Sequence, residues 1–287
     1  MMGRGALLAL VALSVATVVG AAPAATVGDA ATIVFARTVA GGDRLQAVNA
    51  RGSGLRELAR GRRLEDPAWS PDGTRIAVAG PSGLELIDAA TGARSALTAN
   101  RTDGDPSWSP DATRVAFVRT VARNQDVYAV SIETGATARL TSARARDQEP
   151  AWSPDGTTIA FCSVRAGNWE LFLMDADGRR ERRITRTAAA EGLPAWSPAT
   201  ASLAFWRRTP SGTRVFLLAG ERARRLTSGP GNDYDPAWSP DGSMLAFVSD
   251  RGGRPQVYVA GRDGSAAAAV TARGGVPSGP AWQPGFR

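Results

Sequence analysis

Acidic side chains recur along the chain shortly before a repeated Pro-x-Trp sequence, and they are the residues best suited to chemistry. Eight of them form the set of interest: Asp66, Asp103, Asp105, Asp147, Glu149, Glu191, Asp233 and Asp235. Carboxylates gathered around one opening repel one another, so a cation or a basic partner segment would stabilise them. Among metals, Ca²⁺ suits a set of oxygen ligands. We therefore predict a partner-binding or cation-binding rim.

A purely local role for the same acids is the alternative. An acid before a turn can accept hydrogen bonds from nearby amides, and it can pair with a neighbouring cation. Arginines that are close in sequence and available for such pairing are Arg63, Arg101, Arg144 and Arg146. Both interpretations stay open at this level.

Composition excludes much of hydrolase chemistry. The 287 residues include no His, which rules out a Ser-His-Asp triad, a His-ligated metal and an imidazole base. No Gly-x-Ser-x-Gly sequence is present either. All 34 basic residues are Arg, and they outnumber the acids to give a net charge of +7. With 43% hydrophobic residues, the chain has enough apolar side chains for a sizeable core.

A sixfold repeat must position the acids. Pro-Ala-Trp-Ser-Pro, or a close variant, begins at Pro67, Pro106, Pro150, Pro194, Pro236 and Pro280. The Trp residues of this repeat lie 39 to 44 residues apart, a period typical of one four-stranded propeller blade. A typical copy continues with a Pro-Asp-Gly turn, an Ile-Ala-Phe strand, a third apolar strand and a fourth strand that ends in Leu-Thr.

The two ends of the repeat region each hold part of a blade. Three strands are predicted before the first Trp, at residues 31–37, 44–50 and 55–59, whereas nothing follows the last Trp strand. Pairing of these fragments would close a ring and remove the open sheet edges. The predicted fold is therefore all-β, one six-bladed β-propeller of four-stranded blades over residues 26–287.

The repeat unit resembles the WD40-like PD40 repeat of the TolB β-propeller. The matching copies span residues 65–78, 105–117, 149–161 and 235–247, while Asp-Gly is missing after Pro198 and Gly after Asp111. The resemblance implies a propeller of the cell envelope that docks proteins or peptides at its channel face. TolB proteins also carry an α/β domain before the propeller, for which residues 25–31 leave no room.

Other conspicuous residues have structural interpretations. The six repeated Trp residues are predicted to pack against the repeated Ala of a neighbouring blade. Trp206 falls outside this phase and is the predicted exposed contact residue. Cys162 is the only Cys and lies in an apolar run, so a buried inert thiol is expected. Arg-rich stretches at residues 179–186 and 222–225 fall in predicted outer strands and indicate charged, solvated blade edges.

The first 25 residues have the pattern of an export signal. Arg4 supplies the basic start, an apolar stretch follows from Ala6 to Val19, and small residues favour cleavage near Ala24. An uncleaved membrane anchor is the alternative, because the apolar run extends over about 20 residues. Either outcome predicts a periplasmic or extracellular propeller.

The predicted function is a non-catalytic extracytoplasmic scaffold. We expect a monomeric propeller that binds an envelope protein or peptide, binds no nucleic acid and needs no cofactor, with Ca²⁺ in the channel as the one candidate ion. The alternative is a metal-dependent propeller enzyme, of the lactonase or lyase type, that uses channel carboxylates.

Overall fold

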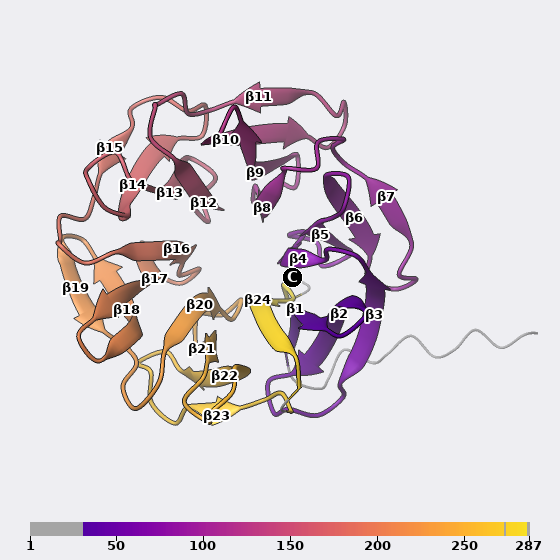
Figure 1. The fold of residues 1–287 in the computed structure, drawn as a ribbon, viewed down its shortest axis with the longest axis vertical. Helices are drawn as coiled ribbons and strands as arrows, with labels where there is room; N and C mark the ends of the chain where they lie inside the picture. Colours follow the sequence, from indigo (N-terminus) through magenta and orange to yellow (C-terminus); the bar gives the residue numbers. More distant parts are fainter. Residues whose placement is uncertain (1–30, 273, 286–287) are drawn as a thin grey trace, which may run out of the picture.

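The computed structural model describes residues 31–272 and 274–285, which form a six-bladed β-propeller (Figure 1). Six four-stranded antiparallel sheets surround a central channel. The predicted fold is confirmed, while the predicted export signal, residues 1–25, lies outside the described residues. Within the described residues, no helix has the length and apolar character needed to cross a membrane.

Each blade runs from an inner strand beside the channel to an outer strand at the edge of the disc (Figure 1). The first blade contains β24 (Val276–Trp282), β1 (Thr32–Val39), β2 (Gly42–Asn49) and β3 (Arg56–Gly61). The second contains β4 (Glu65–Trp69), β5 (Arg75–Ala79), β6 (Leu84–Asp88) and β7 (Arg94–Ala96). The third contains β8 (Gly104–Trp108), β9 (Arg114–Val121), β10 (Asn124–Ser131) and β11 (Thr137–Arg139).

The remaining three blades follow the same order. The fourth contains β12 (Asp147–Trp152), β13 (Thr158–Ser163), β14 (Glu170–Asp175) and β15 (Arg182–Arg183). The fifth contains β16 (Glu191–Trp196), β17 (Ser202–Thr209), β18 (Gly212–Ala219) and β19 (Arg222–Arg225). The sixth contains β20 (Asp233–Trp238), β21 (Met244–Ser249), β22 (Gln256–Gly261) and β23 (Ala268–Ala269). The Arg-rich stretch at 222–225 is the outer strand β19, as predicted, whereas only Arg182 and Arg183 of the stretch at 179–186 lie in an outer strand, β15.

An Asp side chain builds the turn after most inner strands. In the second blade, Asp72 Oδ1 accepts hydrogen bonds from the Ser70 hydroxyl and from the amide and hydroxyl of Thr74. The residue after this Asp is usually a Gly with positive φ, but in the third blade it is Ala112, with φ of 59°. That conformation is strained for Ala, although Asp111 accepts the same turn hydrogen bonds, from Ser109 and Thr113, that Asp72 accepts in the second blade.

The repeated Trp residues fill the interfaces between blades. Trp108 packs against Ala77 of the preceding blade, and its Nε1 donates to the carbonyl of Ala68 at 3.1 Å. Trp282 makes the same bond to the Ala237 carbonyl at 3.0 Å. All six repeated Trp residues lie in apolar clusters that join two blades. Their predicted structural role is confirmed.

The fourth strands are shorter than the sequence predicts. The repeat places a strand end at Thr98, whereas β7 stops at Ala96. The reason is that Thr98 Oγ1 accepts the amide of Leu84 at 2.9 Å, so a side chain replaces the last rung of the ladder. The same bond is made by Thr141, Thr185, Thr227 and Thr271.

Strand β24 closes the ring. It pairs antiparallel with β1, with Trp282 opposite Ile33 and Val276 opposite Thr38. The first blade thus combines three strands from the beginning of the propeller with one from its end, as predicted.

Candidate binding site at the channel entrance

The residue before the repeated Pro has an unusual backbone conformation in every blade. Its φ lies between 49° and 56° at Asp66, Asp105, Glu149, Leu193, Asp235 and Gly279. The pairing of each inner strand with its neighbour shifts register at the same place, which is the mark of a β-bulge. Bulges redirect side chains, and non-Gly residues in this region of φ store strain.

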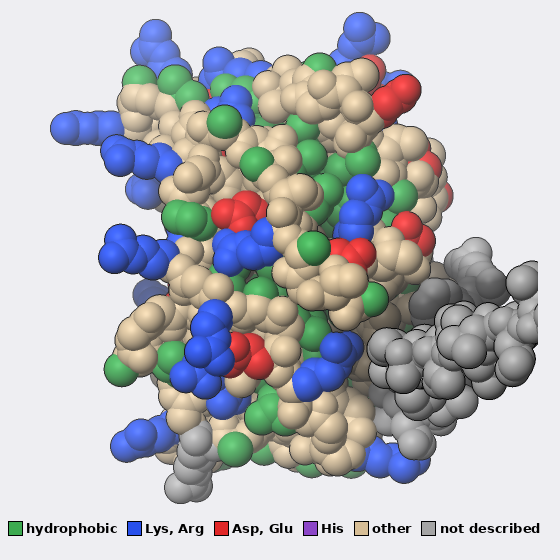
Figure 2. Space-filling model, turned by 90° about the vertical axis from the view of Figure 1, so that its right-hand side faces the viewer, with side chains coloured by type: hydrophobic (Ala, Val, Ile, Leu, Met, Phe, Trp, Pro, Cys, Tyr) green, Lys and Arg blue, Asp and Glu red, His purple; other side chains and the backbone are tan. Residues whose placement is uncertain are grey.

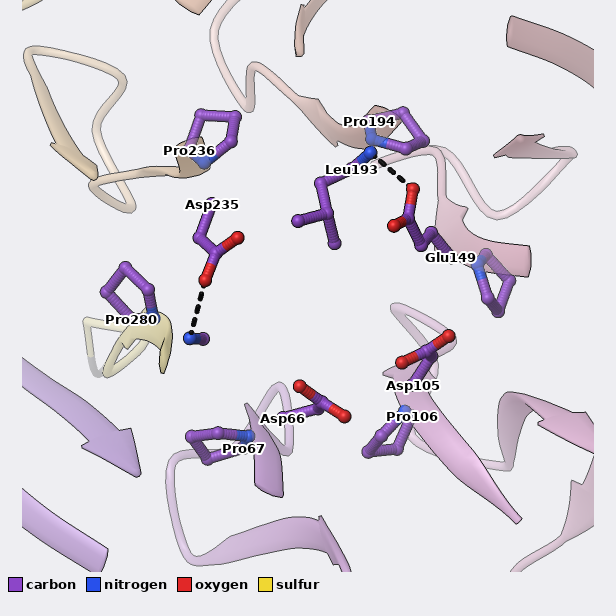
Figure 3. Close-up of a pocket in the computed structure, with 12 residues that line it drawn as sticks. Asp66, Pro67, Asp105, Pro106, Glu149, Leu193, Pro194, Asp235, Pro236 and Pro280 are labelled. Carbon is purple, nitrogen blue, oxygen red and sulfur yellow. Dashed lines mark hydrogen bonds between the residues drawn. The ribbon is translucent and has the colours of Figure 1, made fainter. Parts of the chain in front are cut away.

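These six residues and the prolines that follow them line a cavity of about 160 Å³ on the channel axis (Figure 3). Four of the six are acids, namely Asp66 on β4, Asp105 on β8, Glu149 on β12 and Asp235 on β20. Figure 3 shows their carboxylates arranged around the cavity. We call these four residues the carboxylate ring.

Backbone amides of the next blade hold the carboxylate ring in place. Glu149 Oε2 accepts a hydrogen bond from the Leu193 amide at 2.6 Å, and Asp235 Oδ2 accepts one from the Gly279 amide at 3.2 Å (Figure 3). Asp105 accepts the amide of Glu149 in the same way. Each of these bonds joins one blade to the following one, so the ring also links blades.

The surroundings raise the pKa of every acid in the carboxylate ring. Burial, opposed in part by hydrogen bonds, raises the pKa of Asp105 and of Asp235 to about 6 and that of Glu149 to about 7. For Asp66, burial and the neighbouring Asp105 raise the pKa well above its usual range, and its carboxyl donates a hydrogen bond to Asp105. Near neutral pH, the ring therefore holds protons that a cationic ligand would displace.

The other four predicted rim residues do not reach the cavity. Asp103, Asp147, Glu191 and Asp233 are fully buried, and each forms an ion pair at 2.7 Å, with Arg119, Arg165, Arg207 and Arg251 respectively. They precede the ring position by two residues, before the bulge. The predicted rim is corrected accordingly. In the blade of Glu191, the residue that lines the cavity is Leu193. The alternative of local pairing applies to these four acids.

The arginines that form these pairs are not those expected from sequence proximity. Each lies in or just after the second strand of its blade and also covers aromatic rings; the guanidinium of Arg207 is 4.6 Å from the ring centroid of Phe216. Of the four candidates close in sequence, Arg63 pairs with Glu65 at 3.0 Å. Arg101, Arg144 and Arg146 form no ion pair with any described residue.

Cys162 is buried, free and in contact with the carboxylate ring. Its thiol donates a hydrogen bond to the Glu149 carboxylate. Burial, and next the charge of Glu149, raise the pKa of the thiol well above its usual value, so the thiol stays protonated. This agrees with the predicted inert thiol and gives it a part in holding Glu149.

A Ca²⁺ site at the ring stays a prediction. Among residues 31–272 and 274–285, no group of three or more His, Cys, Asp or Glu side chains is arranged to hold a metal ion. The ring carboxylates face the cavity from different blades (Figure 3).

Trp206, which was predicted to be exposed, is half-buried instead and lines a second pocket beside the ring. Trp169, Tyr234, Arg208 and Asp235 line the same pocket. Trp169 and Tyr234 were not among the predicted contact residues. The sequence feature that could have identified them is the one used for Trp206: each is an aromatic residue that does not occupy the repeated Trp position.

We expect the carboxylate ring to make the propeller less stable as the pH rises from about 4 to about 7. Unfolded carboxyls ionise near pH 4, whereas Asp105, Asp235 and Glu149 ionise at about 6 to about 7 in the folded state. Between these values the folded state binds more protons, so the free energy of unfolding falls as the pH rises. Glu149→Gln should therefore raise stability at about pH 8, by about 1 kcal/mol because the site is partly solvated.

Urea unfolding at about pH 4 and about pH 8 checks this expectation. Glu133→Gln, in the exposed turn between β10 and β11, is the matched control and should leave the pH dependence unchanged. An identical pH dependence for Glu149→Gln and the unmodified protein would show that the pKa of Glu149 is not raised in the folded state.

The fold and this axial cavity define a class, a closed six-bladed propeller with acids at its channel entrance. The family of the TolB beta propeller domain (PD40) matches residues 59–215 and 187–286. The chain therefore belongs to the TolB β-propeller family, which confirms the resemblance seen in its repeats. Comparison with curated proteins gives no match.

Solved structures with the same fold include both TolB proteins and an enzyme. TolB from Acinetobacter baumannii is 23% identical with a TM-score of 0.80, over 89% of this chain and 67% of that one. A putative TolB from Agrobacterium tumefaciens is 21% identical with a TM-score of 0.70, over 87% and 90%. Oligogalacturonate lyase from Vibrio parahaemolyticus is 16% identical with a TM-score of 0.58, over 83% and 73%. At these identities the likeness shows the fold alone.

Proposed function

We propose that this propeller is a non-catalytic scaffold of the cell envelope that binds a segment of a partner protein at its channel entrance. The carboxylate ring carries the proposal. Its four acids come from four blades, surround one cavity, and form no ion pair with any described arginine. The export signal predicted for residues 1–25 and membership of the TolB family support an extracytoplasmic location.

A basic side chain is the group that the ring suits. A Lys ammonium carries three donors and one positive charge, so it can replace the protons that the ring retains near neutral pH. The cavity of about 160 Å³ has room for the end of a side chain but not for a folded domain. The remainder of the partner segment would then lie on the face around the channel.

A random peptide library displayed on phage tests this function. We expect selection with the full chain at about pH 8 to enrich peptides with a Lys or Arg at one fixed position, and binding to weaken about tenfold at about pH 5, where the ring is protonated. The comparison variant neutralises the ring, with Asp66→Asn, Asp105→Asn, Glu149→Gln and Asp235→Asn combined. Enriched peptides that bind this variant as tightly as the unmodified protein would contradict the proposal.

The same two proteins test Ca²⁺ as the occupant. Thermal unfolding is measured with EDTA, with Mg²⁺ and with Ca²⁺. A metal at 100 times its dissociation constant would add about 2.7 kcal/mol, and ring neutralisation would abolish that gain. Identical curves in all three conditions would remove the metal and leave the partner segment as occupant.

A lyase or lactonase is the alternative function, and one observation favours it. Acids with raised pKa values on strained backbone are common in active sites. A fold shared with oligogalacturonate lyase does not define an activity. Incubation with oligogalacturonate, with and without Mn²⁺, separates the two: we expect no unsaturated product, and its appearance would favour the enzyme.

A further inference from the structure

A pocket of about 420 Å³ lies beside the carboxylate ring and shares Asp235 with it. Three aromatic side chains line it, from three different blades: Trp169 just before β14, Trp206 on β17 and Tyr234 on β20. All three are half-buried, so their rings are partly open to a ligand. The volume falls in the range of small-molecule sites, which leaves room for one large side chain.

Gly192 gives Trp206 its place in this pocket. It pairs with Trp206 across β16 and β17, and a Cβ at this position would lie 2.4 Å from the indole ring. The indole therefore occupies the space that a side chain on the inner strand would take. This arrangement brings an aromatic face next to the channel.

Exposed arginines surround the same face of the disc. They lie in the loops that lead into inner strands or near the turns between second and third strands, which meet on one side of each antiparallel sheet. We call them the arginine collar: Arg62, Arg101, Arg123, Arg144, Arg146, Arg186, Arg208 and Arg254. None of the eight forms an ion pair with a described residue.

Exposed acids gather in the turns of the opposite face. They are Asp72, Asp111, Glu133, Asp155, Asp177, Glu221, Asp241 and Asp263. Figure 2 shows the disc edge-on, with arginines projecting from its left margin, the side that faces the viewer in Figure 1. Exposed arginines lie on both faces, whereas most exposed acids lie in these turns, so the face that holds the channel entrance is the more basic of the two.

We propose that the pocket formed by Trp169, Trp206 and Tyr234 anchors an aromatic side chain of the partner segment, and that the arginine collar binds acidic residues beside that anchor. This rests on the proposed function, because the ring would hold the basic side chain of the same segment. An aromatic ring stacks well on indole, and acidic flanks would steer the segment to this face. Burial raises the pKa of Tyr234 to about 12, so its hydroxyl remains a donor.

A polypeptide fits these features better than an anionic membrane. Membrane-surface proteins insert large apolar side chains into the lipid interface. Among the described residues, the large apolar side chains exposed on this face are Val121 and Val276. A flat lipid surface would also make no use of the pocket.

Synthetic peptides test the proposal with the full chain. The parent is a short acidic peptide with a single Trp and a single Lys, and its dissociation constant is measured by fluorescence anisotropy. We expect Trp206→Ala, and likewise Gly192→Ala, to weaken binding at least about tenfold, while Trp206→Phe keeps most of it. Arg146→Gln with Arg208→Gln should weaken binding about tenfold and reduce its salt dependence. The matched control, Arg51→Gln with Arg262→Gln on the opposite face, should change nothing.

Changes in the peptide make the test independent of how the variants fold. Replacing the peptide's Trp by Ala should cause the same loss, with no further loss on the Trp206→Ala protein. If that peptide binds as tightly as the parent while ring neutralisation still abolishes binding, the anchor is wrong and the proposed function stands. If ring neutralisation leaves the affinity unchanged, the proposed function fails instead. Sedimentation with phosphatidylglycerol vesicles that is lost in the collar variant, without loss of peptide affinity, would overturn the proposal in favour of lipid.

Discussion

Removal of residues 276–287 is expected to abolish cooperative folding of the propeller. Without β24, strand β1 has a bare edge, and the cluster around Ile33, Phe35 and Val257 loses Trp282. The loss should exceed the about 3 to 5 kcal/mol typical of a single Trp→Ala change in a core, because a whole strand and a blade interface disappear together. Thermal unfolding followed by near-UV circular dichroism measures it.

Truncation after Gln283 is the matched control for this deletion. It retains β24 and the bond from the Gln283 amide to the Thr32 carbonyl at 2.7 Å. We expect it to melt like the full chain. A cooperative transition within a few degrees of the full chain for the longer deletion would show that ring closure does not depend on β24.

Arg119→Met is expected to destabilise the propeller by about 3 to 5 kcal/mol. Arg119 grips the fully buried Asp103 with two bonds, at 2.7 and 2.8 Å, and the substitution leaves that carboxylate without its cation. Urea unfolding at neutral pH measures the loss. The exposed pair of Arg60 and Glu57 provides the contrast, since Arg60→Met should change stability by less than about 1 kcal/mol.

A double variant separates the net contribution of this ion pair to stability from the destabilisation caused by removing only one partner. The second blade has Leu64, also fully buried, at the place of Asp103. Asp103→Leu combined with Arg119→Met should therefore recover most of the loss, because an apolar pair can replace a buried ion pair. A double variant as unstable as Arg119→Met alone would mean that the ion pair itself is required in this blade.

The sequence could predict the fold because each blade repeats one packing solution. Trp108 and Ala77 sit at fixed places in their copies, so the spacing that reveals the repeat also reveals the interface between blades. Closure by β24 followed from counting strands. The ends of the fourth strands did not follow, because the Thr98 hydroxyl takes a ladder bond that β-propensity does not register.

Only half of the predicted acids line the cavity, because their position relative to the repeated Pro decides where each side chain points. Acids occur at two places, directly before the Pro and two residues earlier, and the bulge sends only the first into the cavity. Asp105 and Asp103 therefore have opposite surroundings although one residue separates them. The distinction is present in the sequence once the bulge is known, but the identity of the buried cation, Arg119, depends on pairing across strands.

Ring closure by the last strand has a consequence for the order in which the protein is made. A chain is synthesised from its N-terminus, so β1, β2 and β3 exist before every other blade, while their fourth strand comes last. Until residues 276–282 emerge, β1 presents a free edge of mostly apolar residues, Thr32–Val39, to any other chain. The other five blades draw all four strands from one stretch of sequence, and can form as they appear. During synthesis, the propeller is thus most prone to incorrect strand pairing at β1, the strand whose pairing with β24 finally closes the ring.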